Sequence, residues 1–180
     1  MNLLRALLLS SLALLAAGCG INNIPTYDEA VKAGWADVQN QYQRRADLVP
    51  NLVETVKGYA AHEQETLQAV VEARAKVGSM QVDSKMLSDP AAMKAFDDAQ
   101  SQLTGALSRL MLVVEKYPDL KANQNFLALQ SQLEGTENRI AVARRDYIES
   151  VKTYNTEIRT FPGLIWHKIL YSDLPVRETF

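Results

Sequence analysis

The sequence predicts an all-α protein: an elongated antiparallel bundle of three long helices, followed by a short C-terminal helical segment. The first observation is compositional, because the 180 residues include only 8 glycines and 6 prolines while good helix formers are abundant. The second is that stretches alternating between apolar and polar residues, which would predict strands, are missing. The third is a seven-residue repeat of large side chains, which predicts a helix buried along one stripe by partner helices. Its members are Phe126, Leu133, Ile140, Tyr147, Tyr154 and Phe161.

The N-terminus has the layout of a signal peptide over residues 1–18, with Arg5 near the start and an apolar run over residues 6–17. This run is shorter than the roughly 20 residues that a membrane-spanning helix needs. Residues 15–19, Leu-Ala-Ala-Gly-Cys, resemble a bacterial lipobox, which implies that Cys19 becomes the N-terminus and carries lipid, including palmitate. Cys19 is the only cysteine, so an internal disulfide and a cysteine-based zinc site are excluded. The alternative is an uncleaved membrane anchor.

The charge of the mature chain argues against nucleic acid as a partner. Removal of residues 1–18 deletes one of the 19 basic residues, so 18 basic and 21 acidic side chains remain, a formal charge of −3. No basic stretch is concentrated enough to hold nucleic acid or to attach the chain electrostatically to anionic lipid.

A tether over residues 19–26 is expected to precede the bundle, which we assign to residues 27–162. Helix one should begin near Tyr27 and Asp28, and its apolar stripe continues as far as Val77. Pro50 falls in the middle of this stripe, where it removes the amide that would bond the carbonyl of Ala46. Because the stripe continues on the same side, the sequence favours one helix that is kinked at Pro50 over two helices.

Start and end signals in the sequence predict the remaining helices. Residues 78–88 form a long polar connection, and Asp89 followed by Pro90 is typical of a helix start. Helix two should end at Tyr117, and a short turn into helix three predicts that the two are antiparallel neighbours. The C-terminal apolar segment and tail, residues 163–180, contain an apolar run at 164–171. It is expected to cover the end of the bundle, or else to contact a membrane interface or a partner.

The search for chemical sites yields no catalytic, metal or cofactor residues. His62-Glu63 lacks the second histidine that a zinc-protease helix needs, because Thr66 stands there, so His62 is expected on the surface. Arg45 lies on the apolar stripe of helix one, so its side chain must either extend to solvent or pair with an acid, with Glu137, Glu157 and Asp47 as candidates. Such a pair would fix the register of the helices rather than catalyse a reaction.

Three blocks of sequence resemble the LemA family in the family's own order: residues 44–63, residues 115–140 and residues 143–162. The first contains Arg-Arg-Ala-Asp-Leu-Val-Pro-Asn-Leu-Val, and the second begins Glu-Lys-Tyr-Pro-Asp-Leu-Lys-Ala-Asn. The resemblance implies a bacterial, membrane-attached helical bundle with long helices and a scaffolding or interaction role. It supplies no catalytic residues. Many relatives carry an N-terminal transmembrane helix, so their membrane sidedness does not transfer to a chain with a lipobox.

These observations predict a lipid-anchored, non-enzymatic scaffold or interaction module that acts on an envelope protein partner, for example by modulating it. The bundle would project on the non-cytoplasmic side of the membrane, and Gly20 after the cysteine hints at the outer membrane if the source is Gram-negative. The alternative is a binding protein that holds a small or lipidic ligand between its helices, in a cavity bordered by residues such as Trp35, Tyr42 and Tyr147.

Overall fold

The computed structural model of the chain describes residues 20–80 and 83–180. The predicted signal peptide and Cys19 therefore lie outside the described residues. The described part is helical and contains no strand, which confirms that the protein is all-α. Its elements are α2 (Asn23–Lys57), α3 (Gln64–Gly78), the 3₁₀ helix η1 (Ser84–Ser88), α4 (Pro90–Val114), α5 (Pro118–Lys121), α6 (Gln124–Glu157) and α7 (Gly163–Leu170).

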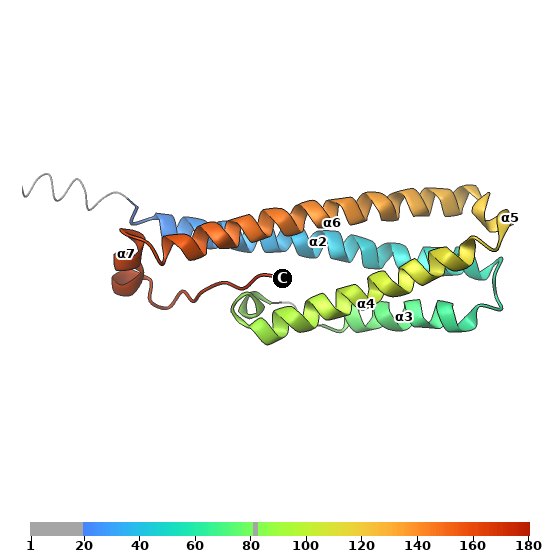
Figure 1. Cartoon of the computed structure of the whole chain (residues 1–180), viewed down its shortest axis with the longest axis horizontal. Helices are drawn as coiled ribbons and strands as arrows, with labels where there is room; N and C mark the ends of the chain where they lie inside the picture. Colours follow the sequence, from blue (N-terminus) through green and yellow to red (C-terminus); the bar gives the residue numbers. More distant parts are fainter. Residues whose placement is uncertain (1–19, 81–82) are drawn as a thin grey trace, which may run out of the picture.

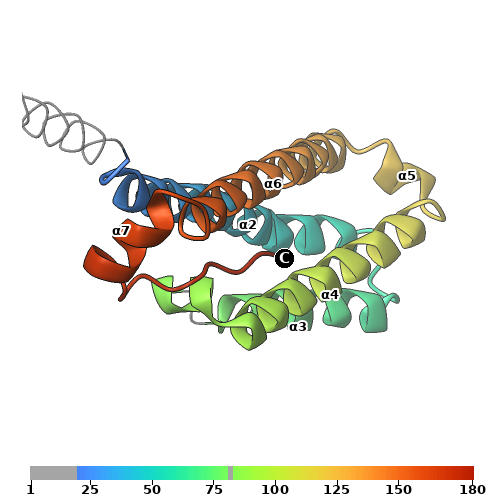
Figure 2. The ribbon, with the colours of Figure 1, turned by 60° about the vertical axis from the view of Figure 1, so that its left-hand side comes forward.

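The four longer helices form an elongated bundle made of two antiparallel pairs (Figure 1). Helices α2 and α6, with 35 and 34 residues, lie side by side. At 1.5 Å per residue each is about 50 Å long. The shorter helices α3 and α4 form the second pair. The prediction that α4 and α6 are neighbours is therefore only half right, because they are antiparallel but α6 packs mainly on α2 (Figure 2).

The first predicted helix is divided in two, which is the main correction to the sequence-based fold. Helix α2 begins at Asn23, four residues earlier than expected, and ends at Lys57. Residues 58–63 then reverse the chain direction, and α3 returns along α2 (Figure 1). A single helix as far as Val77 would leave its second half without a partner, whereas the reversal lets Leu67 and Val70 enter the core. Tyr59, which lies in this turn, is 45% exposed.

Helix α2 continues through Pro50, as the sequence predicted. Proline has no N–H, so the carbonyl of Ala46 lacks its intrahelical donor. Arg74 of α3 supplies the missing hydrogen bond, because its Nε donates to that carbonyl over 3.0 Å. The helix can therefore tolerate an internal proline without leaving the buried Ala46 carbonyl unpaired.

Side-chain caps fix the starts of α4 and α6. Asp89 Oδ1 accepts from the amides of Ala91 and Ala92 at 2.9 and 3.1 Å, which confirms the predicted start of α4. Asn123 Oδ1 accepts from the amide of Phe126 over 3.0 Å at the start of α6. The first five members of the seven-residue repeat in α6 are buried, whereas Phe161 is 81% exposed because α6 ends at Glu157.

The apolar interior is divided into two clusters along the bundle axis. The first lies around Leu52, Leu103 and Phe126, toward α5. The second lies around Trp35, Phe96 and Tyr147, toward α7. Arg45 falls between the two clusters and is 1% exposed. The core is thus interrupted at one level by a polar layer.

The C-terminal segment folds back onto the bundle. Helix α7 closes the end at which α6 finishes, and residues 171–180 then run between the α2–α6 pair and α4 (Figures 1 and 2). A Cβ atom at Gly163 would collide with the carbonyl oxygen of Glu157, so only glycine allows α7 to start this close to α6. The short helix that the sequence predicted to cover the bundle end is present at Gly163–Leu170.

Candidate interaction site

The polar layer centred on Arg45 links three helices in the middle of the bundle. Arg45 Nη1 donates to Glu137 Oε1 over 2.9 Å and to Thr104 Oγ1 over 2.8 Å. Its Nη2 donates to the side-chain oxygen of Gln100 over 2.6 Å and to the Gln100 carbonyl over 3.2 Å. The predicted acid partner is therefore Glu137, and Glu157 and Asp47 do not contribute. Such a layer holds α2, α4 and α6 in one register, because any shift would leave a buried guanidinium unpaired.

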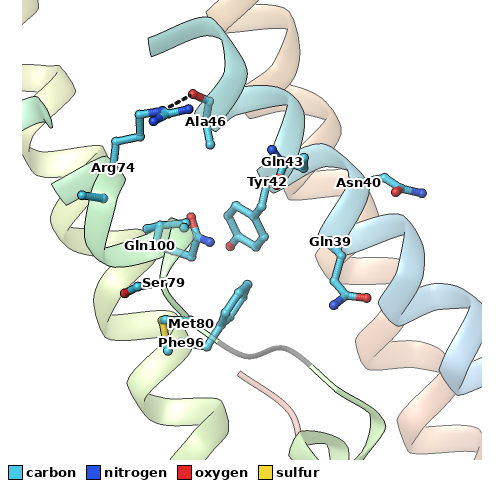
Figure 3. Close-up of a pocket in the computed structure, with 13 residues that line it drawn as sticks. Gln39, Asn40, Tyr42, Gln43, Ala46, Arg74, Ser79, Met80, Phe96 and Gln100 are labelled. Atoms are coloured by element: carbon cyan, nitrogen blue, oxygen red, sulfur yellow. Dashed lines mark hydrogen bonds between the residues drawn. The ribbon is translucent and has the colours of Figure 1, made fainter. Parts of the chain in front are cut away.

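An open groove of about 850 Å³ lies between α2, α3 and α4, next to this layer. Tyr42, Gln43 and Ala46 line it from α2, Arg74 lines it from α3, and Gln100 from α4 (Figure 3). At the floor of the groove, the buried ring of Tyr42 packs edge to face against the buried ring of Phe96, with the ring centroids 5.3 Å apart.

A second groove, of about 530 Å³, lies between α4 and α6 on the other side of Tyr42. Arg144 Nη1 donates to Asp97 Oδ1 over 2.6 Å and to the Tyr42 hydroxyl over 2.8 Å, and so joins α6 to both α4 and α2. Burial raises the pKa of the Tyr42 phenol, although the hydrogen bond from Arg144 opposes that shift. The Tyr42 hydroxyl therefore stays neutral and accepts from the arginine.

An aromatic cluster occupies the space that the ligand-binding alternative required. Trp35 contacts Phe96 and Tyr147, with both pairs of ring centroids 5.3 Å apart. The ring of Phe180 completes the cluster, 5.8 Å from Trp35 and 5.7 Å from Tyr147. The guanidinium of Arg144 covers the Phe180 ring at 3.8 Å from its centroid. The predicted cavity between Trp35, Tyr42 and Tyr147 is thus filled by the protein's own tail, and only Tyr42 borders a groove.

The tail is held by its backbone as well as by its aromatic ring. Tyr147 and Tyr154 donate their hydroxyls to the carbonyls of Glu178 and Pro175 over 2.7 and 2.9 Å. The side chain of Asn155 donates to the Arg177 carbonyl over 2.8 Å and accepts from the Arg177 amide over 3.0 Å. One face of α6 therefore binds an extended chain through groups that every peptide possesses.

A buried ion pair that the sequence did not predict fastens the tail to α2. Arg177 donates from Nε and Nη2 to Asp28 Oδ1 over 2.9 and 2.6 Å, and from Nη1 to Ser88 Oγ over 2.7 Å. The side chains of Asp28 and Arg177 are 3% and 8% exposed. Asp28 could have been found from the sequence, because it lies three residues before Val31 and seven before Trp35, on the apolar stripe. Arg177 and Phe180 gave no such signal, since they follow no periodic pattern.

The described residues hold no group of three or more histidine, cysteine, aspartate and glutamate side chains that could bind a metal ion. His62 is exposed, as the sequence predicted. Across residues 20–80 and 83–180, none of the helices combines the length and the apolar character that a bilayer crossing requires. The lipid attachment expected at Cys19 lies outside this part of the chain.

Comparison with known proteins places these features in a family. Residues 34–174 match the LemA family, so the match includes Arg45 and the Tyr147–Tyr154 face and ends before Arg177. The chain is 30% identical over 157 residues to magnetosome proteins MamQ 1 and MamQ 2 of Paramagnetospirillum magneticum, covering 78% of this chain and 58% of theirs. It is 27% identical over 124 residues to protein LemA of Metamycoplasma hominis, covering 69% and 52%. The chain thus spans a little over half the length of these curated relatives.

Proposed function

The chain belongs to the LemA family, and from that premise we propose that it is a lipid-anchored, non-enzymatic scaffold of the bacterial envelope. In this proposal Cys19 carries the lipid, and the bundle projects on the non-cytoplasmic side of the membrane. The groove between α2, α3 and α4 binds a protein partner there. We use the name partner groove for the surface lined by Tyr42, Gln43, Ala46, Arg74 and Gln100.

The position of the N-terminal end of the described chain is the observation that carries this proposal. Gly20 lies at one tip of the elongated bundle, against Pro162 (Figure 1). A lipid attached one residue earlier would therefore hold the bundle by its tip. The long helical flanks and the partner groove at mid-length would then face the surrounding compartment rather than the membrane.

The chemistry of the partner groove favours a protein over a small ligand. The groove is open, and exposed polar side chains such as Asn40 and Gln43 line it beside the aromatic rings of Tyr42 and Phe96. Small-molecule sites are concave and largely apolar, and they bury most of the ligand. The more apolar interior near Trp35 is occupied by Phe180. The ligand-binding alternative therefore has no comparable support.

Site-specific photocrosslinking in living cells tests the proposal. A photoreactive amino acid is placed at Gln43 in the partner groove or at Gln132, an exposed glutamine of α6 that serves as the matched control. We expect Gln43 to give a discrete crosslinked product in the membrane fraction and Gln132 to give none. The same products from both positions, or no product from either, would contradict a partner in this groove.

A further inference from the structure

Helix α7 presents apolar side chains to solvent at the tip of the bundle where the chain enters. We use the name apolar tip for five exposed apolar side chains on α7 and just before it. Their exposed fractions are 81% for Phe161, 37% for Leu164, 43% for Ile165, 67% for Ile169 and 50% for Leu170. Single exposed hydrophobic residues are common, but Ile165 and Ile169 lie four residues apart on one face of α7 with Leu164 beside them, and such a group calls for a covering surface.

The helix cannot bury this patch by rotating, because its other face is already occupied. Trp166 packs against the second apolar cluster of the core, together with Tyr171 and Leu174 after the helix. His167 Nε2 lies 2.8 Å from the carbonyl of Leu174, and Gly163 is fixed against Glu157. The side of α7 that carries Trp166 and His167 therefore packs on the bundle, and the side chains of the apolar tip remain exposed.

The start of the described chain lies beside the apolar tip. A Cβ atom on Gly20 would lie 3.7 Å from Pro162 Cγ, and Asn23 Nδ2 donates to Glu157 Oε1 over 3.1 Å at the same corner. The sequence before Gly20 is apolar over residues 6–17 and ends in Cys19. If lipid on Cys19 attaches the chain, the attachment point is one residue, about 3.8 Å of chain, from Gly20. If an uncleaved apolar segment attaches it, the last apolar residue, Ala17, lies three residues, at most about 11 Å of chain, from Gly20.

From this placement we propose that the apolar tip docks into the lipid surface to which the N-terminus is attached. The proposal rests on the membrane attachment in the proposed function. A tether of one to three residues makes docking an intramolecular event, so a patch too small to bind membranes alone becomes effective. Exposed aliphatic and aromatic residues beside Lys168 match the composition of helices that lie in a membrane interface.

Docking at a second point would orient the bundle. A single lipid chain or a flexible anchor allows a rod to tilt freely, whereas two contacts at one tip restrict its angle to the membrane. The partner groove would then be held at a defined height and direction above the lipid surface.

Fluorescence quenching by lipids with brominated acyl chains tests the docking. The full chain, purified from membranes, is reconstituted into phosphatidylethanolamine–phosphatidylglycerol vesicles and floated to measure attachment. Two variants carry an added tryptophan at equally exposed positions, Ile169→Trp in α7 and Leu112→Trp at the far end of the bundle, which are 67% and 70% exposed. We expect brominated lipid to quench the added fluorescence of Ile169→Trp and not that of Leu112→Trp.

A second substitution, which adds a charge, tests whether the added tryptophan inserts into the lipid by itself. In the Ile169→Trp chain, Ile165→Glu should abolish the quenching, while Leu127→Glu, at a similarly exposed position of α6, should leave it unchanged. Floated protein with equal quenching, or none, at positions 169 and 112 overturns the docking and leaves the membrane anchor intact. Protein that does not float with the vesicles overturns both the docking and the proposed anchor. Quenching that Ile165→Glu does not reduce would also contradict docking through the apolar tip.

Discussion

The hydrogen bond from Arg74 to the carbonyl of Ala46 should be the reason that α2 tolerates Pro50. Arg74 Nε lies 3.0 Å from that oxygen, and with Arg74 in place Ala46 is only 6% exposed. A hydrogen bond from a charged donor is worth about 1.5–3 kcal/mol. We therefore expect Arg74→Ala to lower the free energy of unfolding by about 2 kcal/mol.

A double-mutant cycle with Pro50→Ala isolates the cause. Alanine restores the backbone N–H of residue 50, which can bond the Ala46 carbonyl inside the helix. In that background Arg74→Ala should cost at least about 1 kcal/mol less than in the natural chain. Chemical unfolding followed by circular dichroism gives all four stabilities, with the exposed Arg44→Ala as control. An equal cost of Arg74→Ala in both backgrounds would refute the reasoning.

Three further predictions concern the buried polar groups. Arg45→Ala should lower the free energy of unfolding by about 3–5 kcal/mol, because it breaks a buried charged network, and Arg44→Ala should change it by less than about 0.5 kcal/mol; equal effects in chemical unfolding would contradict the polar layer. Asp28→Asn should destabilise the chain by about 3 kcal/mol and increase proteolysis of the tail, since Arg177 keeps its charge without a counter-ion; an intact tail in limited proteolysis would count against the ion pair. Burial raises the pKa of Tyr154 to about 12, so the folded phenol stays protonated while the unfolded one ionises from about pH 10. The contribution of Tyr154 to the free energy of unfolding should therefore be complete below about pH 10 and be lost as the pH rises toward 12. Unfolding measured over a pH series should show a shallower fall in stability for Tyr154→Phe than for the natural chain.

The helical repeat made α6 and Arg45 predictable from the sequence. Five large residues at spacing seven, from Phe126 to Tyr154, are buried as expected. Arg45 was recognised because it occupies an apolar register position, and one of its three candidate partners, Glu137, is the observed one. The position of a residue in the repeat is a strong signal because the helical period fixes the face of the helix on which its side chain lies.

The division between α2 and α3 could not be read from the same signal. The apolar stripe has the same spacing before and after residues 58–63, so its period does not reveal that the chain reverses there. Leu67 and Val70 reach the core only if the chain reverses, and this depends on tertiary packing rather than on local spacing. Gly58 was the single local sign of a break.

The tail was unpredictable for a different reason. Residues 171–180 have no period, and they bind through backbone groups and through Arg177 and Phe180, whose partners lie far away in the sequence. The hydrogen bond between Arg177 and Asp28 joins residues 149 positions apart. Sequence reasoning that depends on local spacing cannot detect such contacts.

Metabolic labelling with radioactive palmitate tests the central proposal of a lipid-anchored scaffold most directly. Cells producing the natural chain are compared with cells producing Cys19→Ala, and incorporation into the protein is measured. The proposal predicts label in the natural chain, none in the variant, and loss of the variant from the membrane fraction. An unlabelled natural chain that stays in the membrane would contradict the lipid anchor. It would indicate that residues 1–18 remain as an uncleaved anchor, and the side of the membrane on which the bundle lies would then be undetermined.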